Sequence, residues 1–166
     1  MQKIIIIGCP GAGKSTLAKA LGQKLDLPVV HLDRLFWRSG WVNVSKEEFD
    51  ALLAEELKKD AWIIDGNYSR TLPQRLAACN TVIYLDFPAA LCLWGVVKRV
   101  LRSYGKTRDD MGEGCPERFD KAFMQYIWNF NKENRHKLYF ALDHAEGKKI
   151  VILKNHRQVK KFLKDS

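Results

Sequence analysis

The chain has 166 residues, of which 46% are hydrophobic and 28% are charged. This composition is typical of a folded globular protein and excludes a disordered or fibrous chain. The length predicts a single domain over residues 1–166 with a sizeable core. No apolar run reaches the roughly 18 residues of a membrane-spanning helix, and the first residues lack the pattern of a signal peptide. We therefore expect a cytoplasmic protein with no membrane partner.

The net charge is strongly positive, with 28 basic and 19 acidic residues and a formal value of +9. Much of the excess lies between Lys132 and Ser166, where ten Lys or Arg residues stand against four Asp or Glu residues. Such a surplus suits a polyanionic partner, and the phosphates of a small molecule or of a nucleic acid both qualify. The alternative is a solvated basic surface without a partner.

The four cysteines, Cys9, Cys79, Cys92 and Cys115, lie far apart in the sequence. No pair has the short spacing of a zinc site, and a chain of this length needs no disulfides for stability. We expect four free thiols.

Short apolar runs alternate with helical patterns along the whole chain. The runs predict five strands, at residues 4–7, 28–32, 61–64, 81–85 and 150–153. Helical spacing of apolar residues predicts helices that start near residues 14, 45, 71, 88, 119 and 156. Two capping boxes, Ser45 with Glu48 and Thr71 with Gln74, mark helix starts. This alternation predicts an α/β fold with a doubly wound, five-stranded parallel sheet.

The segment after the first predicted strand carries a phosphate-binding motif. Residues 8–15 read Gly8, Cys9, Pro10, Gly11, Ala12, Gly13, Lys14 and Ser15, which match G-x-x-x-x-G-K-S/T at every fixed position. The glycines let the backbone wrap a phosphate with its N–H groups pointing inward. The Lys14 ammonium then neutralises β- and γ-phosphate charge, the Ser15 hydroxyl ligates Mg²⁺, and Thr16 lies near the α-phosphate. The sequence therefore predicts a site for ATP and Mg²⁺. The alternative is an accidental glycine-rich turn, which the buried strand before the motif and the helix after it disfavour.

A magnesium ion at this motif needs a carboxylate at the end of a neighbouring strand. Two residues fit, because Asp65 and Asp86 each follow a predicted strand. The alternative for each is a strand-end turn or a helix cap.

These features together resemble known kinases. The order of a phosphate loop, five strands and a late loop rich in Gly and Arg resembles the adenylate-kinase-like nucleoside and nucleotide kinases, and Asp65-Gly66 followed by Arg70 is similar to their Asp-Gly-x-x-Arg segment, with one extra residue. More specifically, four segments resemble the bacterial DNA topology modulation protein family. They are residues 31–37, 62–68, 110–112 and 117–119, which read HLDRLFW, WIIDGNY, DMG and ERF. The resemblance covers nearly the whole chain.

The resemblance implies a three-layer P-loop NTPase fold with an acceptor-binding insertion at about residues 33–60 and a mobile lid at about residues 103–117. It implies a phosphotransferase that moves the γ-phosphate of Mg-ATP to a small acceptor, a nucleotide or a nucleoside. Asp33 follows the second strand, where a carboxylate can accept the proton of an attacking hydroxyl. The alternative for Asp33 is a helix cap or a surface ion pair with Arg34. A monophosphate acceptor needs no such base, and Asp33 would then bind a ribose or a basic group.

Further candidates lie around this acceptor segment and the lid. Trp37 and Trp41 either stack on an aromatic acceptor or fill the local core. Arg70 and Arg75 are candidates for binding an acceptor phosphate. Arg99, Arg102 and Arg118 flank the lid, which also contains Arg108, and such arginines stabilise the charge of the transferred phosphoryl group. For any one of these arginines, the alternative is a solvated surface charge.

A second hypothesis is an ATP-binding, nucleic-acid-associated protein that uses ATP as a switch and has no small-molecule kinase activity. The charge of +9 suits it, but the chain has no recognised nucleic-acid-binding motif. A regulatory GTPase is disfavoured because Asn-Lys-x-Asp is absent.

Overall fold

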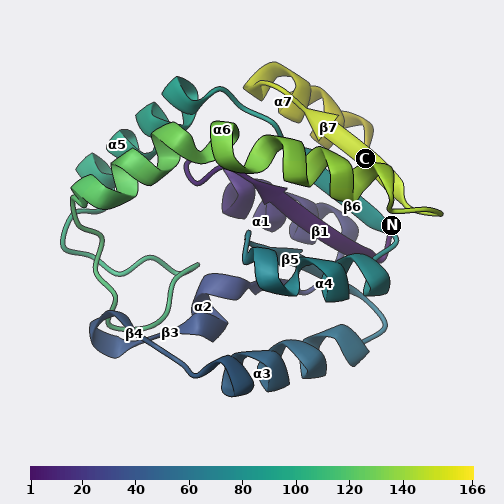
Figure 1. Ribbon diagram of the computed structural model, residues 1–166, viewed down its shortest axis with the longest axis horizontal. Coiled ribbons are helices and arrows are strands. Elements are labelled where there is room, and N and C mark those ends of the chain that lie inside the picture. The colour runs from purple at the N-terminus through teal and green to yellow at the C-terminus, as the bar shows by residue number, and fades with distance from the viewer.

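The computed structural model describes all 166 residues of the chain (Figure 1). Its main element is a five-stranded, all-parallel sheet with the strand order β2-β5-β1-β6-β7. The strands are β1 (Lys3–Gly8), β2 (Val29–His31), β5 (Trp62–Asp65), β6 (Thr81–Leu85) and β7 (Lys149–Leu153). The predicted doubly wound sheet is confirmed.

Helices cover both faces of this sheet and make three layers. The helices are α1 (Lys14–Leu25), α2 (Leu32–Phe36), α3 (Lys46–Lys58), α4 (Leu72–Ala78), α5 (Ala89–Ser103), α6 (Lys121–Asp143) and α7 (His156–Asp165), with two short 3-10 helices, η1 (Ser39–Trp41) and η2 (Ser69–Thr71). Helices α1, α5 and α7 pack on one face, and α3 and α4 pack on the other. The long helix α6 contributes to both cores.

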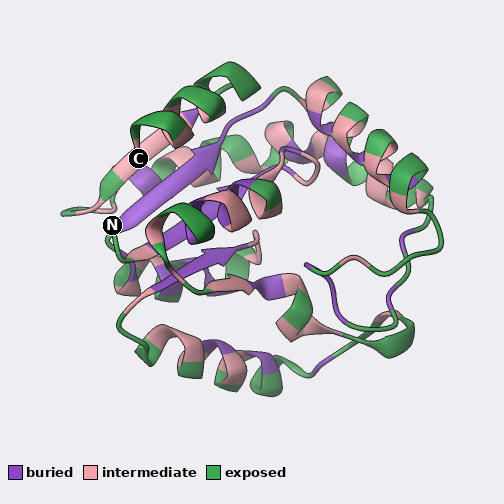
Figure 2. Ribbon diagram, turned by 180° about the vertical axis from the view of Figure 1, so that it is seen from behind, coloured by how far each residue is buried: buried purple, intermediate pink, exposed green.

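The central strand shows why two cores form. Successive side chains of a strand point to opposite faces. In β1, Ile4 and Ile6 therefore join the core under α1 and α5, whereas Ile5 and Ile7 join the core under α3 and α4. All four side chains are fully buried, and each such burial stabilises the fold by about 1.5–3 kcal/mol. Figure 2 shows the buried strands between helices whose outer faces are exposed.

Three local details differ from the sequence-based expectations. The Ser45 cap is confirmed, because its side chain accepts from the Glu48 N–H, but the predicted Thr71 capping box is wrong. The Thr71 hydroxyl instead donates to the Tyr68 carbonyl oxygen at 3.0 Å, because a tight turn precedes α4. The second strand, predicted to end at Leu32, ends at His31, because Leu32 begins α2. The sequence analysis also missed an antiparallel pair, β3 (Trp37–Arg38) with β4 (Val42–Asn43).

Two chain-wide features complete the description. All four cysteines are buried and unpaired. No helix combines the length and the apolar character that crossing a membrane requires.

The topology decides where a ligand can bind. From β1, at the centre of the sheet, the chain runs first to β2 and β5 on one side and later to β6 and β7 on the other. In such a sheet a crevice opens at the carboxyl ends of the strands, where the strand order reverses. The loop after β1 lies at that point.

Helix α5 packs unusually close to this loop. A Cβ atom at Gly95 would lie 2.2 Å from the carbonyl oxygen of Gly11. Alanine has a helix propensity about 1 kcal/mol better than glycine, but overpacking against backbone costs roughly 1–3 kcal/mol. We expect Gly95→Ala to lower the free energy of unfolding by about 1–2 kcal/mol in urea titrations, since neither backbone can yield easily.

The control for this variant is Leu101→Ala, in the same helix at a side chain that is 75% exposed. It should change the free energy of unfolding by less than about 0.5 kcal/mol. A Gly95→Ala variant as stable as the wild type would show that α5 does not press on the loop.

Candidate active site

The loop between β1 and α1 has the backbone of a phosphate-binding loop. Gly11 and Gly13 have φ angles of 84° and 94°, a region that residues with side chains rarely adopt. A Cβ atom at Gly11 would lie 2.1 Å from the carbonyl oxygen of Cys92 in α5. The N-cap of α1, Gly13, has no side chain to bond the first N–H groups of this 12-residue helix. These free N–H groups and the positive end of the helix dipole form an anion site.

Lys14 lies across this loop. Its Nζ donates to the carbonyl oxygens of Gly8 and Cys9 at 2.8 and 3.1 Å. Burial lowers the pKa of the Lys14 ammonium, and the negative charge of Asp65 opposes that shift. A buried ammonium that is bonded only to neutral oxygens is stabilised by an incoming anion.

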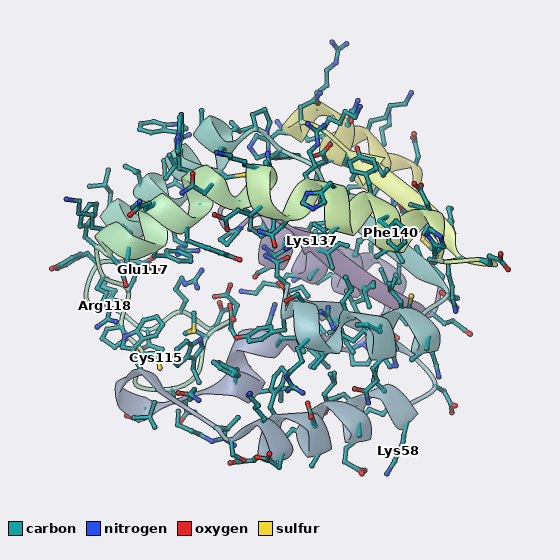
Figure 3. The ribbon with its side chains drawn as sticks, viewed as in Figure 1. Lys58, Cys115, Glu117, Arg118, Lys137 and Phe140 are labelled. Atoms are coloured by element: carbon teal, nitrogen blue, oxygen red, sulfur yellow. The ribbon has the colours of Figure 1, made fainter.

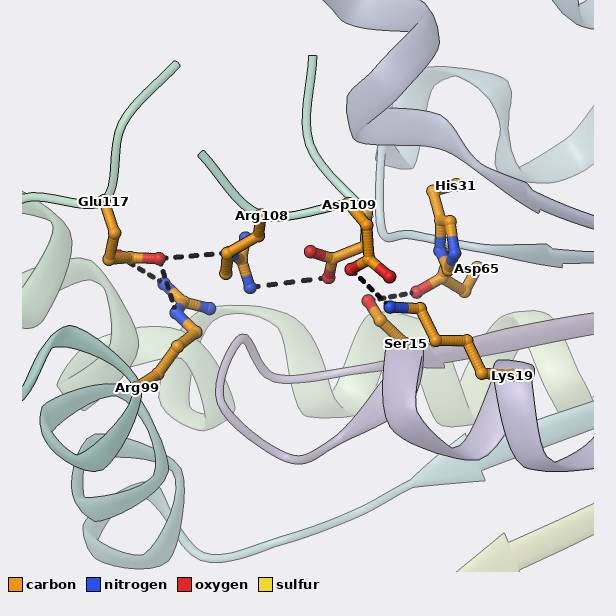
Figure 4. Close-up of polar contacts among 9 residues, drawn as sticks. Ser15, Lys19, His31, Asp65, Arg99, Arg108, Asp109 and Glu117 are labelled. Carbon is orange, nitrogen blue, oxygen red and sulfur yellow. Dashed lines mark hydrogen bonds and ion pairs between the residues drawn. The ribbon is translucent and has the colours of Figure 1, made fainter. Parts of the chain in front are cut away.

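Asp65 joins three elements beside the loop. Its Oδ2 accepts from the Ser15 hydroxyl at 2.7 Å, and its Oδ1 lies 2.6 Å from His31 Nδ1 (Figure 4). Asp65 is only 4% exposed, although it lines the cavity described below. A hydroxyl and a carboxylate next to an anion site are the oxygen ligands that Mg²⁺ takes in phosphate-binding proteins. The residues present therefore fit a magnesium ion.

Asp86, the other candidate for the metal, has a different environment. Its Oδ2 accepts from Arg135 at 2.7 Å and from Tyr139 at 2.9 Å, both on α6. The residue is buried and is absent from the cavity wall. This carboxylate connects β6 to α6 and does not face the loop.

Asp33 and Tyr68 face each other on the β2 and β5 side of the loop. The Tyr68 hydroxyl donates to Asp33 Oδ1 at 2.6 Å. Burial raises the pKa of the Asp33 carboxyl, and the Tyr68 hydrogen bond and the charge of Lys14 oppose the shift. A carboxylate with a raised pKa is suited to accept a proton.

Arg75 builds the turn that carries Tyr68. Its guanidinium is fully buried (0% exposed) and donates to the carbonyl oxygens of Gly66, Asn67 and Tyr68. Burial lowers the pKa of Arg75 to about 10. Tyr68 itself has a positive φ of 30°, so the turn is held in a strained form by its neighbours.

Residues 104–117, which correspond to the predicted lid, form a loop that packs on the other elements around the crevice. Gly40 N–H donates to the Gly114 carbonyl oxygen at 2.9 Å, and the Cys115 thiol lies 3.1 Å from the Arg38 carbonyl oxygen. Lys19 of α1 pairs with Asp109 at 2.5 Å (Figure 4). The β3–β4 pair, missed from the sequence, is the surface against which this loop rests.

Two arginines share one buried carboxylate at the base of the loop. Arg99 Nε and Arg108 Nε each lie 3.0 Å from Glu117 Oε2 (Figure 4). Arg108 also pairs with Asp110 at 3.4 Å. Burial and the charge of Arg108 lower the pKa of Arg99. The Glu117 carboxylate thus holds together two cations that would otherwise repel each other.

One cavity of about 1000 Å³ joins these groups. Its wall includes the sequence-predicted residues Pro10, Gly11, Gly13, Lys14, Ser15, Thr16, Asp33, Asp65, Arg99 and Arg102. Gly8 ends β1, and Cys9 and Ala12 are buried beneath the loop. Such a concave site with few convergent charges is the usual form of a small-molecule site.

A family model described as an AAA domain matches residues 4–100, which is more than half of the chain. The chain belongs to the AAA domain family. The matched range contains the phosphate-binding loop, Asp33 and Asp65. Residues within the matched range thus supply the anion site and the carboxylates of Asp33 and Asp65, whereas the 104–117 loop, with Asp110, lies beyond the match.

An adenylate kinase of Thermosipho africanus is 29% identical over 111 residues, which are 65% of this chain and 50% of that protein. The chain spans between half and three-fifths of the length of the curated relatives that it matches. These relatives and the AAA domain support the resemblance to adenylate-kinase-like P-loop kinases. None of the relatives named here carries the DNA topology modulation name, and that part of the resemblance stays a prediction.

Two solved structures share the fold. A shikimate kinase from Acinetobacter baumannii in complex with shikimate has a TM-score of 0.65 and 18% identity, and the match covers 99% of this chain and 90% of that chain. A shikimate kinase from Bacteroides thetaiotaomicron has a TM-score of 0.56 and 17% identity, with 98% and 94% covered. The likeness confirms the three-layer P-loop NTPase fold.

Several sequence-predicted residues lie outside the cavity. Arg70 pairs with Asp50 at 2.7 Å on the exposed side of α3. Trp37 packs on Phe36 and Trp41, and Arg118 lies over the Trp41 ring at 5.1 Å. Figure 3 shows Arg118 beside Glu117 and Cys115 at one end of the molecule. In each case a nearer partner in the protein holds the side chain.

Sequence reasoning assigned no role to three residues that shape the site, namely His31, Tyr68 and Glu117. His31 and Tyr68 lie in segments already noted for their resemblance to a known family, but their partners lie more than 30 positions away. No local pattern indicates such pairs. Arg108 was noted in the loop, and its place on the cavity wall appears only in the folded chain.

The pKa of Asp33 makes a prediction about stability. Burial raises this pKa above its usual 3.8, because the native state disfavours the ionised carboxyl. The ionised Asp33 therefore lowers the free energy of unfolding, and this loss is complete only above the native pKa. It is absent below 3.8, where the carboxyl is protonated in both states. Asp33→Asn should therefore unfold at a higher urea concentration than the wild type at pH 7, and the gain should shrink as the pH approaches 4.

The matched control is Asp50→Asn, because the Arg70 hydrogen bond lowers the pKa of the exposed Asp50. Its pH dependence should have the opposite sign, with any loss of stability at neutral pH vanishing in acid. A lower urea midpoint for Asp33→Asn at pH 7 would contradict the assigned environment of Asp33.

Proposed function

We propose that the protein is an ATP-dependent phosphotransferase that moves the γ-phosphoryl group of Mg-ATP to a small acceptor, a nucleotide or a nucleoside. One observation carries the proposal. The phosphate-binding loop with Lys14, the Ser15–Asp65 pair, the Asp33 carboxylate and the arginines Arg99 and Arg108 all line a single cavity. The adenylate kinase relatives support the same reaction class.

The donor phosphates bind at the start of α1. The free N–H groups of the loop and the Lys14 ammonium bind the β- and γ-phosphates. Ser15 and Asp65 hold the magnesium ion, which when bound neutralises charge on these two phosphates. His31 keeps the Asp65 carboxylate in place, since it occupies the other carboxylate oxygen.

The cations across the cavity stabilise the phosphoryl group while it is transferred. Arg99, Arg102 and Arg108 face the cavity and stabilise the charge of the transferred phosphoryl group. The 104–117 loop acts as the lid, and the 33–60 segment is the surface on which it closes. Closure excludes water, which would otherwise compete with the acceptor for the phosphoryl group.

The proposal predicts that Lys14→Ala abolishes phosphoryl transfer. We expect acceptor-dependent ADP release from Mg-ATP to fall by at least about 100-fold, because the main positive charge on the β- and γ-phosphates is lost. The assay measures ADP against a panel of nucleoside monophosphates, nucleosides and small hydroxyl metabolites.

The control is Lys58→Ala, at a solvated lysine near the end of α3 and away from the cavity (Figure 3). It should keep the wild-type rate. If no acceptor of the panel raises ADP release in the wild type, the phosphotransferase proposal is wrong.

A second prediction separates the two aspartates. Asp65→Asn should raise the Mg²⁺ concentration for half-maximal activity by at least about 10-fold, because mutating even a partner that only orients a metal ligand costs about 10–100-fold in affinity. Asp86→Asn should leave that concentration unchanged and lower the free energy of unfolding by roughly 1–3 kcal/mol, because buried hydrogen bonds from Arg135 and Tyr139 lose their charged partner. Titrations of Mg²⁺ and of urea on both variants test the assignment, and a change in the Mg²⁺ requirement for Asp86→Asn would contradict it.

A second candidate function has one observation in its favour. Arg157, Lys160, Lys161 and Lys164 of α7 are exposed and take part in no ion pair with another side chain. This basic face suits a polyanion such as DNA. Salt-dependent DNA binding that is lost with these residues but kept in Lys14→Ala would favour an ATP-binding, nucleic-acid-associated protein.

A further inference from the structure

The phosphate-binding loop divides the cavity into two sides. On one side lie the residues that follow β2 and β5, and on the other lie those that follow β6 and β7, because the loop leaves the central strand. The two sides have different charges. Lys98, Arg99 and Arg102 of α5 and His156 of α7 line the β6–β7 side.

The β2–β5 side has no cation of its own. The polar residues that follow β2 and β5 on this wall are Asp33, Asp65, Asn67, Tyr68 and Ser69, which are acidic or neutral. The remainder of this wall is apolar or neutral, with Leu72 from α4 and Asn134 and Leu138 from α6.

Two arginines in this region are already committed elsewhere. Arg70 makes two hydrogen bonds to Asp50, at 2.7 and 2.8 Å, and does not line the cavity. Arg75 is fully buried, and its guanidinium bonds three backbone carbonyl oxygens. To reach a second phosphate, Arg75 would have to break the contacts that build the turn at Tyr68, and Arg70 would have to leave Asp50.

The lid arginine does not supply the missing charge. Arg108 pairs with both Glu117 and Asp110, and Glu117 also pairs with Arg99, so the two carboxylates balance the two arginines. An acceptor phosphate on the β2–β5 side would instead lie beside the carboxylates of Asp33 and Asp65. Burying such a charge without a partner is strongly unfavourable.

We propose, on the basis of the phosphotransferase function above, that the acceptor is an uncharged compound that presents a hydroxyl group, such as a nucleoside or a polyol, and not a nucleoside monophosphate. Asp33 is the base. The hydroxyl oxygen forms a bond to the γ-phosphorus, and the bond from that phosphorus to the β–γ bridging oxygen breaks. ADP leaves with the electron pair, and the hydroxyl proton passes to Asp33.

Tyr68 orients this base. Its hydroxyl donates to Oδ1 of Asp33 and leaves Oδ2 for the acceptor hydroxyl. Tyr68 is thus a positioning residue, held by the three carbonyl contacts of Arg75. The Asp33 carboxylate therefore has two effects: its charge repels an acceptor phosphate, and its free oxygen accepts the proton of an acceptor hydroxyl.

The first test uses a probe that carries extra phosphates. Dinucleoside pentaphosphates join an ATP to a second nucleoside through two further phosphates, so they report whether the acceptor side binds phosphate. Calorimetric titrations compare ATP with pentaphosphates whose second nucleoside is adenosine, guanosine, uridine or thymidine. We expect none to bind more than about threefold tighter than ATP, and any that binds about tenfold tighter or more would overturn the inference.

Asp33→Asn sharpens this test. Removing the carboxylate removes its repulsion of an acceptor phosphate, so the affinity for a pentaphosphate relative to ATP should rise by about threefold to tenfold. The isosteric control Asp60→Asn, at an exposed aspartate after α3 that does not line the cavity, should leave that ratio unchanged. A residue with a merely structural role would not raise the ratio, and an unchanged ratio in Asp33→Asn would contradict the inference.

The activity arm compares each nucleoside with its own 5′-monophosphate. We expect phosphorylated product from a hydroxyl acceptor only, with a kcat that falls by about 100-fold or more in Asp33→Asn. Conversion of a monophosphate to a diphosphate would overturn the acceptor class and leave the phosphotransferase function standing. Failure of the wild type to bind ATP would reject the function itself, so the two failures are distinguishable.

Discussion

The site depends on the two hydrogen bonds that the Asp65 carboxylate makes with Ser15 and His31. This carboxylate stands at the end of β5, accepts from Ser15 at the start of α1 and contacts His31 at the end of β2. Both carboxylate oxygens are therefore fixed, although the residue lines the cavity. This places the start of α1, with its free N–H groups, against the end of the neighbouring strand. The anion site and the proposed metal site share one rigid frame for that reason.

A second constraint lies on the opposite side of the loop. Helix α5 approaches so closely that Gly11 and Gly95 leave no room for a Cβ atom. The helix that supports the loop also ends in Arg99 and Arg102, so the position of the loop and the position of these cations are coupled. Glu117 then links Arg99 to Arg108 of the lid. The cations are thereby held as a group, which is the preorganised arrangement that stabilises developing charge.

The acceptor side is built by residues far apart in the sequence. The Asp33–Tyr68 hydrogen bond joins α2 to the turn after β5. Arg75 stabilises that turn by donating to its backbone carbonyl oxygens. Arginines near an acceptor segment suggest phosphate binding when they are viewed in the sequence alone. In the folded chain Arg70 has Asp50 as its partner and Arg75 has three carbonyl oxygens, so neither faces the cavity. The charge balance of the acceptor side thus rests on these pairings.

The sequence by itself determined the sheet, the phosphate-binding loop and the candidate aspartates. The strands follow from short apolar runs, and the phosphate-binding loop follows from glycine and lysine at fixed spacing. Both patterns lie within short stretches of the sequence, so they can be recognised without the fold. Only the tertiary structure decided that Asp65 faces the loop while Asp86 bonds Arg135, that the 104–117 loop rests on the β3–β4 pair, and that Arg70 and Arg118 point away. The physical reason is that each charged side chain is held by a partner, an opposite charge for Arg70 and an aromatic ring for Arg118, and folding brings that partner close.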